Sequence, residues 1–295
     1  IPTYFKTKIK KKLKGYQIFV YEFVPNEKLK SFEKANNLLE RLLENNLNRS
    51  DTIIAVGGGI IGDFSSFVAS ILKRGVNFIN LPSTLLAQVD SAVGGKTAVN
   101  SSKGKNLIGT FYQPKLVISE LSFLKSLNKR NIVCGFAEIL KHAIINDIKF
   151  FKKLRNNLDK ILNEYNPIIM KEIVFQSCKI KLNFVKKDEK EKRERMILNF
   201  GHTFAHGIEA ANKYSRKINH GEAVLVGMML ATRLSYYKKI CNYKTLNEIE
   251  KIYLRNSYLK KFSKLLSKSD IGKIVKFMKI DKKNYDNKIS LILLR

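Results

Sequence analysis

The chain has 295 residues, of which 44% are hydrophobic, and a formal net charge of +30 at pH 7. The hydrophobic content and the periodic apolar segments exclude a disordered chain, and the length predicts a globular protein of two domains. No apolar run approaches 18 residues, so no membrane-spanning helix is expected, and the basic start lacks the apolar segment of a signal peptide. Three widely separated cysteines (Cys134, Cys178 and Cys241) favour a reducing, cytoplasmic compartment over a disulfide framework.

The positive charge has two interpretations. A basic surface can hold nucleic acid, or it can attract small polyanions such as phosphate esters. The lysines are scattered through every expected helix, and neither zinc-finger spacing nor an aromatic RNA-binding run occurs. We therefore expect no nucleic-acid or membrane partner, and we assign most of the charge to solvated faces.

The first part of the chain alternates between apolar runs and helical patterns. Residues 16–24 indicate a buried strand, and residues 29–47 carry apolar side chains at helical spacing. Strands at 52–56 and 76–81 enclose a helix at 64–72, which is the pattern of a parallel strand–helix–strand unit. A further strand is expected at 115–119, so this part predicts a Rossmann-like α/β domain with a parallel-rich sheet.

Beyond residue 127 almost every segment has the helical period. The expected helices are at 130–146, 149–162, 168–187, 199–212 and 221–237, with shorter ones to about 279 and a last strand at 289–294. The change of period predicts an α/β nucleotide-binding domain at 1–127. A mainly helical metal- and substrate-binding domain would follow at 128–295.

Two glycine-rich loops are candidate anion sites. Gly57, Gly59 and Gly62 form a G-x-G-x-x-G pattern directly after a strand, where bare backbone lets a pyrophosphate approach the start of a helix. No acid ends the next strand, so a standard dehydrogenase fold is not expected, and a tight structural turn is the alternative. The loop from Asp90 to Lys96 suits a phosphate or carboxylate, or is an ordinary polar loop.

Three of the four histidines fall within 19 positions. His202 and His206 are four residues apart on an expected helix, and His220 follows. Imidazoles at this spacing with a remote third ligand are typical of catalytic zinc sites. The spacing does not say which two histidines bind, and core or capping histidines without a metal are the alternative.

Charged residues on two other helices are candidates as well. Glu138, Lys141 and His142 share one helix face, which is either a metal- and anion-binding face or a solvated face with an ion pair. Lys181 lies on the apolar stripe of its helix, so it is either buried beside a functional cavity or extends to solvent.

With these motifs assembled, the sequence resembles the 3-dehydroquinate synthases. The resemblance covers residues 25 to 228 nearly without interruption, with a weaker match at 281–283. It is carried by GGGIIGDFSSFVAS (57–70), RGVNF (74–78), LPSTLLAQVDSAVGGKTAVN (81–100), GKNLIGTFYQP (104–114), GFAEILKHA (135–143), LNFGHTFAHGIEA (198–210) and NHGEAVLVGM (219–228).

The resemblance implies a phosphate lyase of the shikimate pathway, which leads to chorismate and the aromatic amino acids. Its substrate would be 3-deoxy-D-arabino-heptulosonate 7-phosphate and its products 3-dehydroquinate and phosphate. The steps would be a transient oxidation by NAD, β-elimination, re-reduction and intramolecular aldol closure. Zinc, or Co2+ in its place, would be the metal, and the enzyme would be a homodimer.

Site residues follow from the resemblance, position by position. The metal ligands would be Glu138, His202 and His220, with His206 beside the metal. The substrate anion would be bound by Lys96, Asn106, Lys141, Lys181, Arg195, Asn199 and one of Lys282 or Lys283, with Arg74 supplied by a second subunit. NAD would contact Glu27, Lys30, Gly58, Gly59, Ile60, Asp63, Ser83, Thr84, Asp90, Lys96, Lys105 and the 123–126 segment, including Phe123 and Ser126.

The sequence departs from the family pattern in a few places. The family usually begins with further N-terminal strands, and we expect this chain, which lacks an initial methionine, to start after them. Substitutions occur at Pro25-Asn26 (usually Asp-Gly), Ser83 and Ser126 (usually threonine) and Asn128 (usually proline). The alternative functions are a sister sugar-phosphate cyclase, a metal-dependent alcohol or polyol dehydrogenase, and a basic scaffold without activity; Asn199 and His206 favour the dehydroquinate enzymes.

Overall fold

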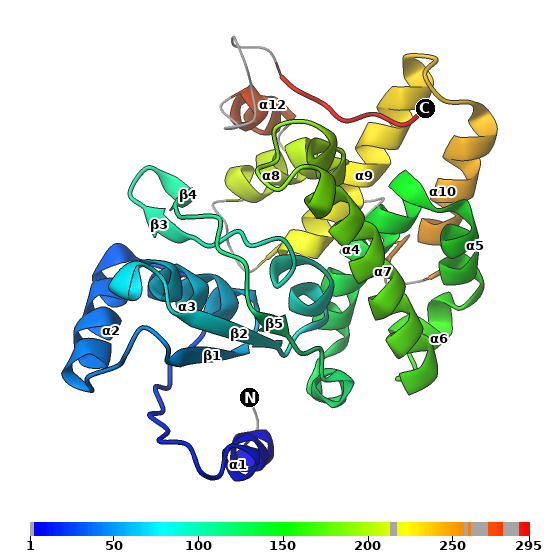
Figure 1. Cartoon of the computed structure of the whole chain (residues 1–295). Helices are drawn as coiled ribbons and strands as arrows, with labels where there is room; N and C mark the ends of the chain where they lie inside the picture. Colours follow the sequence, from blue (N-terminus) through cyan, green and yellow to red (C-terminus); the bar gives the residue numbers. More distant parts are fainter. Residues whose placement is uncertain (1–2, 213–216, 257–258, 261–270, 280–288) are drawn as a thin grey trace. The chain divides into compact units, whose positions relative to one another are not determined.

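The computed structural model describes residues 3–212, 217–256, 259–260, 271–279 and 289–295. The chain divides into two compact units, Ile1–Leu127 and Asn128–Arg295, and each is described by itself (Figure 1). None of the helices within these ranges is long and apolar enough to cross a membrane.

A parallel sheet organises the first unit. In the described residues it consists of β1 (Thr52–Gly57), β2 (Asn77–Pro82) and β5 (Leu116–Val117), in the order β1-β2-β5. Thr52 lies opposite Asn77 and Gly57 lies opposite Pro82, so β1 and β2 end at the same edge. The segments that follow these two ends carry the glycine loop and Ser83-Thr84, which is where ligands bind in open parallel sheets.

Helix α3 (Gly59–Ile71) connects β1 to β2 and packs on both strands (Figure 1). Phe64, Phe67 and Val68 of this helix are buried, together with Ala55 and Phe78 of the strands. Helix α2 (Phe32–Glu44) covers α3 with its apolar stripe and begins at the side-chain cap of Ser31. This apolar core fixes the strand–helix–strand unit that the sequence pattern predicts.

Shorter elements complete the first unit. An antiparallel pair is formed by β3 (Val99–Ser101) and β4 (Gly104–Ile108). The remaining elements are α1 (Thr3–Lys12), the short 3-10 helices η1 (Glu27–Leu29), η2 (Leu72–Arg74) and η4 (Leu121–Ser126), and a π-helical turn η3 (Ala87–Ser91).

The secondary-structure elements described in the second unit are all helices. The elements are α4 (Lys129–Asn146), α5 (Ile148–Asn156), α6 (Leu158–Leu162), α7 (Pro167–Lys187), η5 (Glu194–Asn199), α8 (His202–Ala211), α9 (His220–Tyr237), α10 (Tyr243–Arg255) and α12 (Ile271–Lys279) (Figure 1). Every residue from Ile132 to Ala143 in α4 is buried, and so is most of α9. Helices buried on all sides form the centre of a domain, and here α7, α8 and α10 pack around this pair.

Most expected elements are confirmed, but two expected strands are wrong. Residues 16–24 form no strand, and Tyr16 and Val24 expose 77% and 76% of their surface. Residues 289–294 are also without strand pairing. Both segments have the apolar character of strands, but a strand needs a hydrogen-bonding neighbour, and no described strand pairs with either of them.

Candidate active site

The glycine loop of the first unit leaves backbone donors open at the start of α3. Gly58 is the N-cap, and no described side chain caps the helix there. A Cβ atom added to Gly58 would lie 3.2 Å from Thr84 Cγ2, and one added to Gly59 would lie 3.0 Å from Ser91 Oγ. The close packing leaves little room for a side chain at either position. The N–H groups at the start of the helix therefore stay open, and they suit a phosphate.

A buried lysine joins one residue expected near the cofactor to one expected at the substrate. Lys30 Nζ donates to Asp63 Oδ2 and to Asn106 Oδ1, both at 2.6 Å. Burial raises the pKa of the Asp63 carboxyl, although the charge of Lys30 opposes this rise. Asn106 has a left-handed backbone, with φ of 55°, which turns its side chain within this network.

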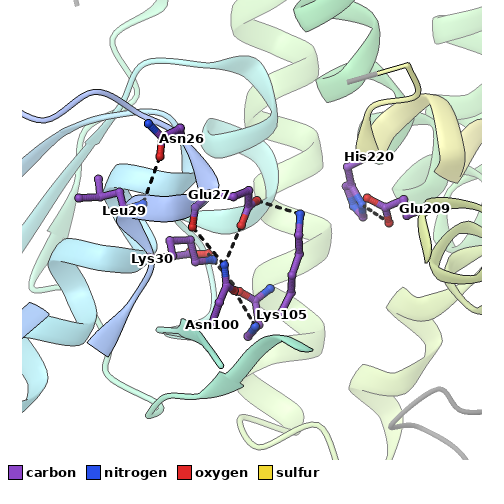
Figure 2. Close-up of polar contacts among 10 residues, drawn as sticks. Asn26, Glu27, Leu29, Lys30, Asn100, Lys105, Glu209 and His220 are labelled. Carbon is purple, nitrogen blue, oxygen red and sulfur yellow. Dashed lines mark hydrogen bonds and ion pairs between the residues drawn. The ribbon is translucent and has the colours of Figure 1, made fainter. Parts of the chain in front are cut away.

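Glu27 has its own polar cluster, in which Asn100 Nδ2 donates at 2.9 Å and Lys105 Nζ lies 3.2 Å away (Figure 2). Burial on its own would raise the pKa of the Glu27 carboxyl, but Asn100, Lys105 and Lys30 lower it below its ordinary value. Asn100 was not among the predicted site residues. Its position at the end of the 81–100 motif was the available signal.

The other expected cofactor and substrate residues of this unit lie on its loops. Ser83 N donates to Gly57 O at 2.8 Å, which ties the end of β2 to the glycine loop. The remaining positions are Ile60 in the first turn of α3, Thr84 after β2, Asp90 in η3, Lys96 after Gly94 and Gly95, Phe123 and Ser126 in η4, and Arg74 at the end of η2 with φ of 67°.

The second unit brings one carboxylate and two imidazoles together. Glu138 lies on α4, His202 opens α8, and His220 opens α9. The Nε2 atoms of His202 and His220 are 3.5 and 3.6 Å from Glu138 Oε1, and the ligand atoms of all three residues lie within 4.8 Å of one another. The expected metal ligands are therefore close enough to share an ion.

The surroundings of Glu138 fit a divalent cation. Its side chain is 0% exposed, and Oε1 accepts no hydrogen bond from the residues that the structure describes, while Lys141 pairs with Oε2. Burial alone would raise the pKa of the Glu138 carboxyl, but the charge of Lys141 and the neighbouring His220 hold this pKa well below its ordinary value. One buried, ionised carboxylate oxygen and two ring nitrogens together match the ligand set of a catalytic zinc site with two histidines and one glutamate.

Each of the two imidazoles has an acceptor behind it. His220 Nδ1 lies 3.3 Å from Glu209 Oε2, and His202 Nδ1 lies 3.3 Å from Phe200 O (Figure 2 shows the first pair). An acceptor at Nδ1 favours the proton on that nitrogen. Both Nε2 atoms, which face Glu138, can then serve as metal ligands. Glu209 was not among the expected site residues, although it lies inside the 198–210 motif.

His206 stands beside this cluster but is not part of it. Its ring centroid is 5.7 Å from that of His202, but among the described residues it belongs to no group of possible metal ligands, whereas His202 and His220 share one with Glu138. The i,i+4 spacing of His202 and His206 therefore does not identify the clustered pair, a question that the spacing had left open.

Helix α9 begins directly against α4. Gly221 N lies 3.3 Å from Cys134 Sγ, and a Cβ atom added to Gly221 would lie 2.4 Å from both Cys134 Cα and Cys134 O. Only glycine allows this approach, which sets the position of the adjacent His220.

We expect Gly221→Ala to lower the free energy of unfolding by about 1–3 kcal/mol through overpacking. The variant should also bind metal more weakly, since α9 must move away from Glu138. Denaturant unfolding and a zinc titration measure the two effects. Gly104→Ala, where the added Cβ would meet only the flexible side chain of Leu107, is the control and should change neither.

Buried cations lie on α4 and on two elements that pack against it, α7 and η5. Lys141 and Arg195 are almost fully buried, and Lys181 is 6% exposed, so the solvent-facing interpretations of Lys141 and Lys181 are wrong. His142 Nδ1 lies 2.7 Å from Ser177 Oγ, which joins α4 to α7 one turn before Lys181. Arg195 lies in η5 with its guanidinium on Glu189 O, and Asn199 donates to Glu191 at 2.7 Å. Lys282 and Lys283 lie outside the described residues.

Solved structures with this fold include two synthases with higher TM-scores, and alcohol and glycerol dehydrogenases with lower ones. A 2-deoxy-scyllo-inosose synthase complexed with carbaglucose-6-phosphate, NAD+ and Co2+ has a TM-score of 0.86 and 29% identity, with 100% of this chain and 80% of that chain covered. ValA, a 2-epi-5-epi-valiolone synthase from Streptomyces hygroscopicus subsp. jinggangensis 5008 with NAD+ and Zn2+ bound, has a TM-score of 0.72 and 25% identity over 78% of this chain and 64% of that chain. The expected fold class is confirmed.

Sequence comparison specifies the family more narrowly. Residues 20–134 match the N-terminal model of 3-dehydroquinate synthase, and residues 135–284 match the C-terminal model. The 3-dehydroquinate synthase of Pelagibacter ubique (strain HTCC1062) is 48% identical over 97% of this chain and 77% of its own length. The chain belongs to the 3-dehydroquinate synthase family, which confirms the resemblance inferred from its motifs.

Proposed function

We propose that this chain catalyses the family's reaction with NAD and with a zinc ion bound by Glu138, His202 and His220. The reaction would convert 3-deoxy-D-arabino-heptulosonate 7-phosphate into 3-dehydroquinate and phosphate. The observation that carries this proposal is the buried Glu138 oxygen that faces two imidazole Nε2 atoms at 3.5 and 3.6 Å. The NAD+ and the Co2+ or Zn2+ in the two similar cyclase structures support the same cofactor and metal class.

The cofactor and the metal supply the chemistry that side chains lack. When bound, NAD accepts and later returns a hydride at one substrate carbon, while the divalent ion acts as a Lewis acid. Oxidation of that carbon acidifies the neighbouring C–H bond. Loss of its proton and of the phosphate group breaks a carbon–oxygen bond, so the overall reaction is that of a lyase.

The residues of the first unit would hold NAD. The open N–H groups at Gly58–Ile60 would bind the pyrophosphate at the start of α3. Glu27, with its lowered pKa, would present an ionised carboxylate to ribose hydroxyls, and Lys30 would hold Asp63 and Asn106 in place beside it. The remaining contacts are assigned to Ser83, Thr84, Asp90, Lys96, Lys105, Phe123 and Ser126 by their family positions.

The substrate anions would be bound mainly by buried cations. Lys141, Lys181 and Arg195 are desolvated, which strengthens their attraction for phosphate and carboxylate groups. Asn199 and His206 would add hydrogen bonds in the second unit, and Lys96 and Asn106 in the first. Arg74 would act in the second subunit of a homodimer. Fixed cations of this kind stabilise the anionic states of the elimination.

A phosphate-release assay with the heptulosonate phosphate tests the proposal. The protein loaded with zinc and NAD should release phosphate without net NADH accumulation, because the hydride returns to the substrate. Treatment with a chelator should abolish release, and added Zn2+ or Co2+ should restore it. Continued NADH production would indicate a dehydrogenase, and no turnover of the loaded protein would contradict the proposal.

A further inference from the structure

Helices α4 and α9 meet along one face of α4, at residues spaced four apart. Arg130 pairs with Glu222, Cys134 accepts from Gly221, and Glu138 lies beside His220. Residues at i, i+4 and i+8 lie on one side of a helix, so these contacts form a continuous row about 12 Å long. His220 is thus held at the end of a row that begins two turns away.

The first contact of this row is a two-point ion pair. Arg130 Nε donates to Glu222 Oε1 at 2.8 Å, and Arg130 Nη2 donates to Glu222 Oε2 at 2.6 Å. The same Nη2 also donates to Lys217 O at 2.9 Å, in the segment before α9. The Glu222 side chain is 6% exposed and the Arg130 side chain is 39% exposed, so the carboxylate is shielded from water and its main charged partner reaches it from the surface. The two-point geometry makes the pair specific for an arginine.

Glu222 also closes the first turn of α9. Asn219 N donates to Glu222 Oε2 at 2.8 Å, and Glu222 N donates to Asn219 Oδ1 at 2.9 Å, which is a capping box. His220 lies between these two residues as the first residue of the helix. Whatever fixes Glu222 therefore fixes the backbone from which the His220 imidazole projects.

We propose that Arg130 is a positioning residue that, through Glu222, holds His220 at ion-sharing distance from Glu138. The inference rests on the proposed metal site. Arg130 and Glu222 would raise the affinity for the metal without contacting it. Cys134 and Gly221 set how closely the helices approach, and the ion pair sets where α9 begins along α4.

A zinc titration of metal-free protein against a competing chelator tests this role. Arg130→Met should weaken zinc affinity about tenfold, at the low end of the range for residues beyond the ligands themselves. Arg130→Lys should fall between this variant and the wild type, because an ammonium does not form the two-point pair. Glu222→Gln keeps a residue that suits the capping box but loses the ion pair, so it should weaken binding as much as Arg130→Met.

The double variant and a matched control separate positioning from stability. Arg130→Met with Glu222→Gln should weaken affinity no further than either change alone, because both remove one interaction. Arg233→Met removes a comparable pair, at 2.8 Å, between the distal part of α9 and Glu250 of α10, and it should leave zinc affinity unchanged. Thermal unfolding of the metal-free proteins reports any general loss of stability.

Two outcomes would overturn the proposal, and the zinc affinity of the wild type distinguishes them. If the wild type binds zinc and Arg130→Met and Glu222→Gln bind it equally well, Arg130 has a structural role at most. If the wild type itself binds no zinc, the proposed metal site fails and this inference fails with it. Should Arg130→Met not fold, Glu222→Gln decides the question.

Discussion

His202→Ala is expected to remove bound zinc and activity together. The change deletes one of two imidazole nitrogens that face Glu138 Oε1, at 3.5 Å, and leaves too few protein ligands for a catalytic site. We expect turnover to fall by at least about 10²–10³-fold, the range seen when one element of transition-state charge stabilisation is lost. Metal analysis after gel filtration and the phosphate-release assay measure the two effects.

The matched variant is His206→Ala, one helical turn along α8. Its imidazole packs edge-to-face beside that of His202 but lies outside the cluster, so this variant should retain zinc while it loses turnover. The pair of variants separates a ligand from a neighbour, which the i,i+4 spacing alone does not do. Full zinc content in His202→Ala, or zinc loss in His206→Ala with His202 intact, would contradict the assigned roles.

Lys181→Met should produce a folded, metal-bound and nearly inactive protein. Lys181 is buried on the apolar stripe of α7, and a methionine of similar length fits such a position. The substitution removes a desolvated cation from the proposed anion site, so we expect kcat to fall by about 10²–10³-fold. Zinc content and NAD binding should remain at wild-type levels.

The control for this variant is Lys179→Met, two residues earlier on the same helix. Lys179 is exposed, so its charge is screened by solvent and its loss should not change kcat. Thermal unfolding should show both variants folded at the assay temperature, so that a loss of kcat in Lys181→Met reports the missing cation and not unfolding. Wild-type turnover in Lys181→Met would remove this residue from the substrate site.

The local sequence pattern predicted helices and strands well where the segment that packs or pairs with them lies nearby in the sequence. The apolar stripe of α2 and the short apolar runs of β1 and β2 have their neighbours nearby in the sequence, and these elements are confirmed. Residues 16–24 carry an equally strong apolar pattern. A strand depends on a pairing edge, however, and the apolar pattern of a segment does not show whether one is present.

Some features of the candidate site could likewise be predicted from the sequence, and others could not. The helical face of Glu138, Lys141 and His142 was visible in the spacing, but its burial was not, because burial depends on α7 and α9 packing on α4. Glu138 and His220 are 82 positions apart, so only the resemblance to a family placed them together. Glu209 and Arg130 were missed because they act through other residues, and such roles leave no spacing pattern of their own.

Zinc K-edge X-ray absorption of the loaded protein tests the central claim most directly. If Glu138, His202 and His220 hold the ion, the spectrum should show two imidazole nitrogens and oxygen ligands at about 2.0–2.2 Å, and no sulfur. The Cys134 thiol is close to the start of α9, and burial raises its pKa, so it is the sulfur to exclude. A zinc–sulfur distance of about 2.3 Å, or a spectrum without paired imidazoles, would contradict the account.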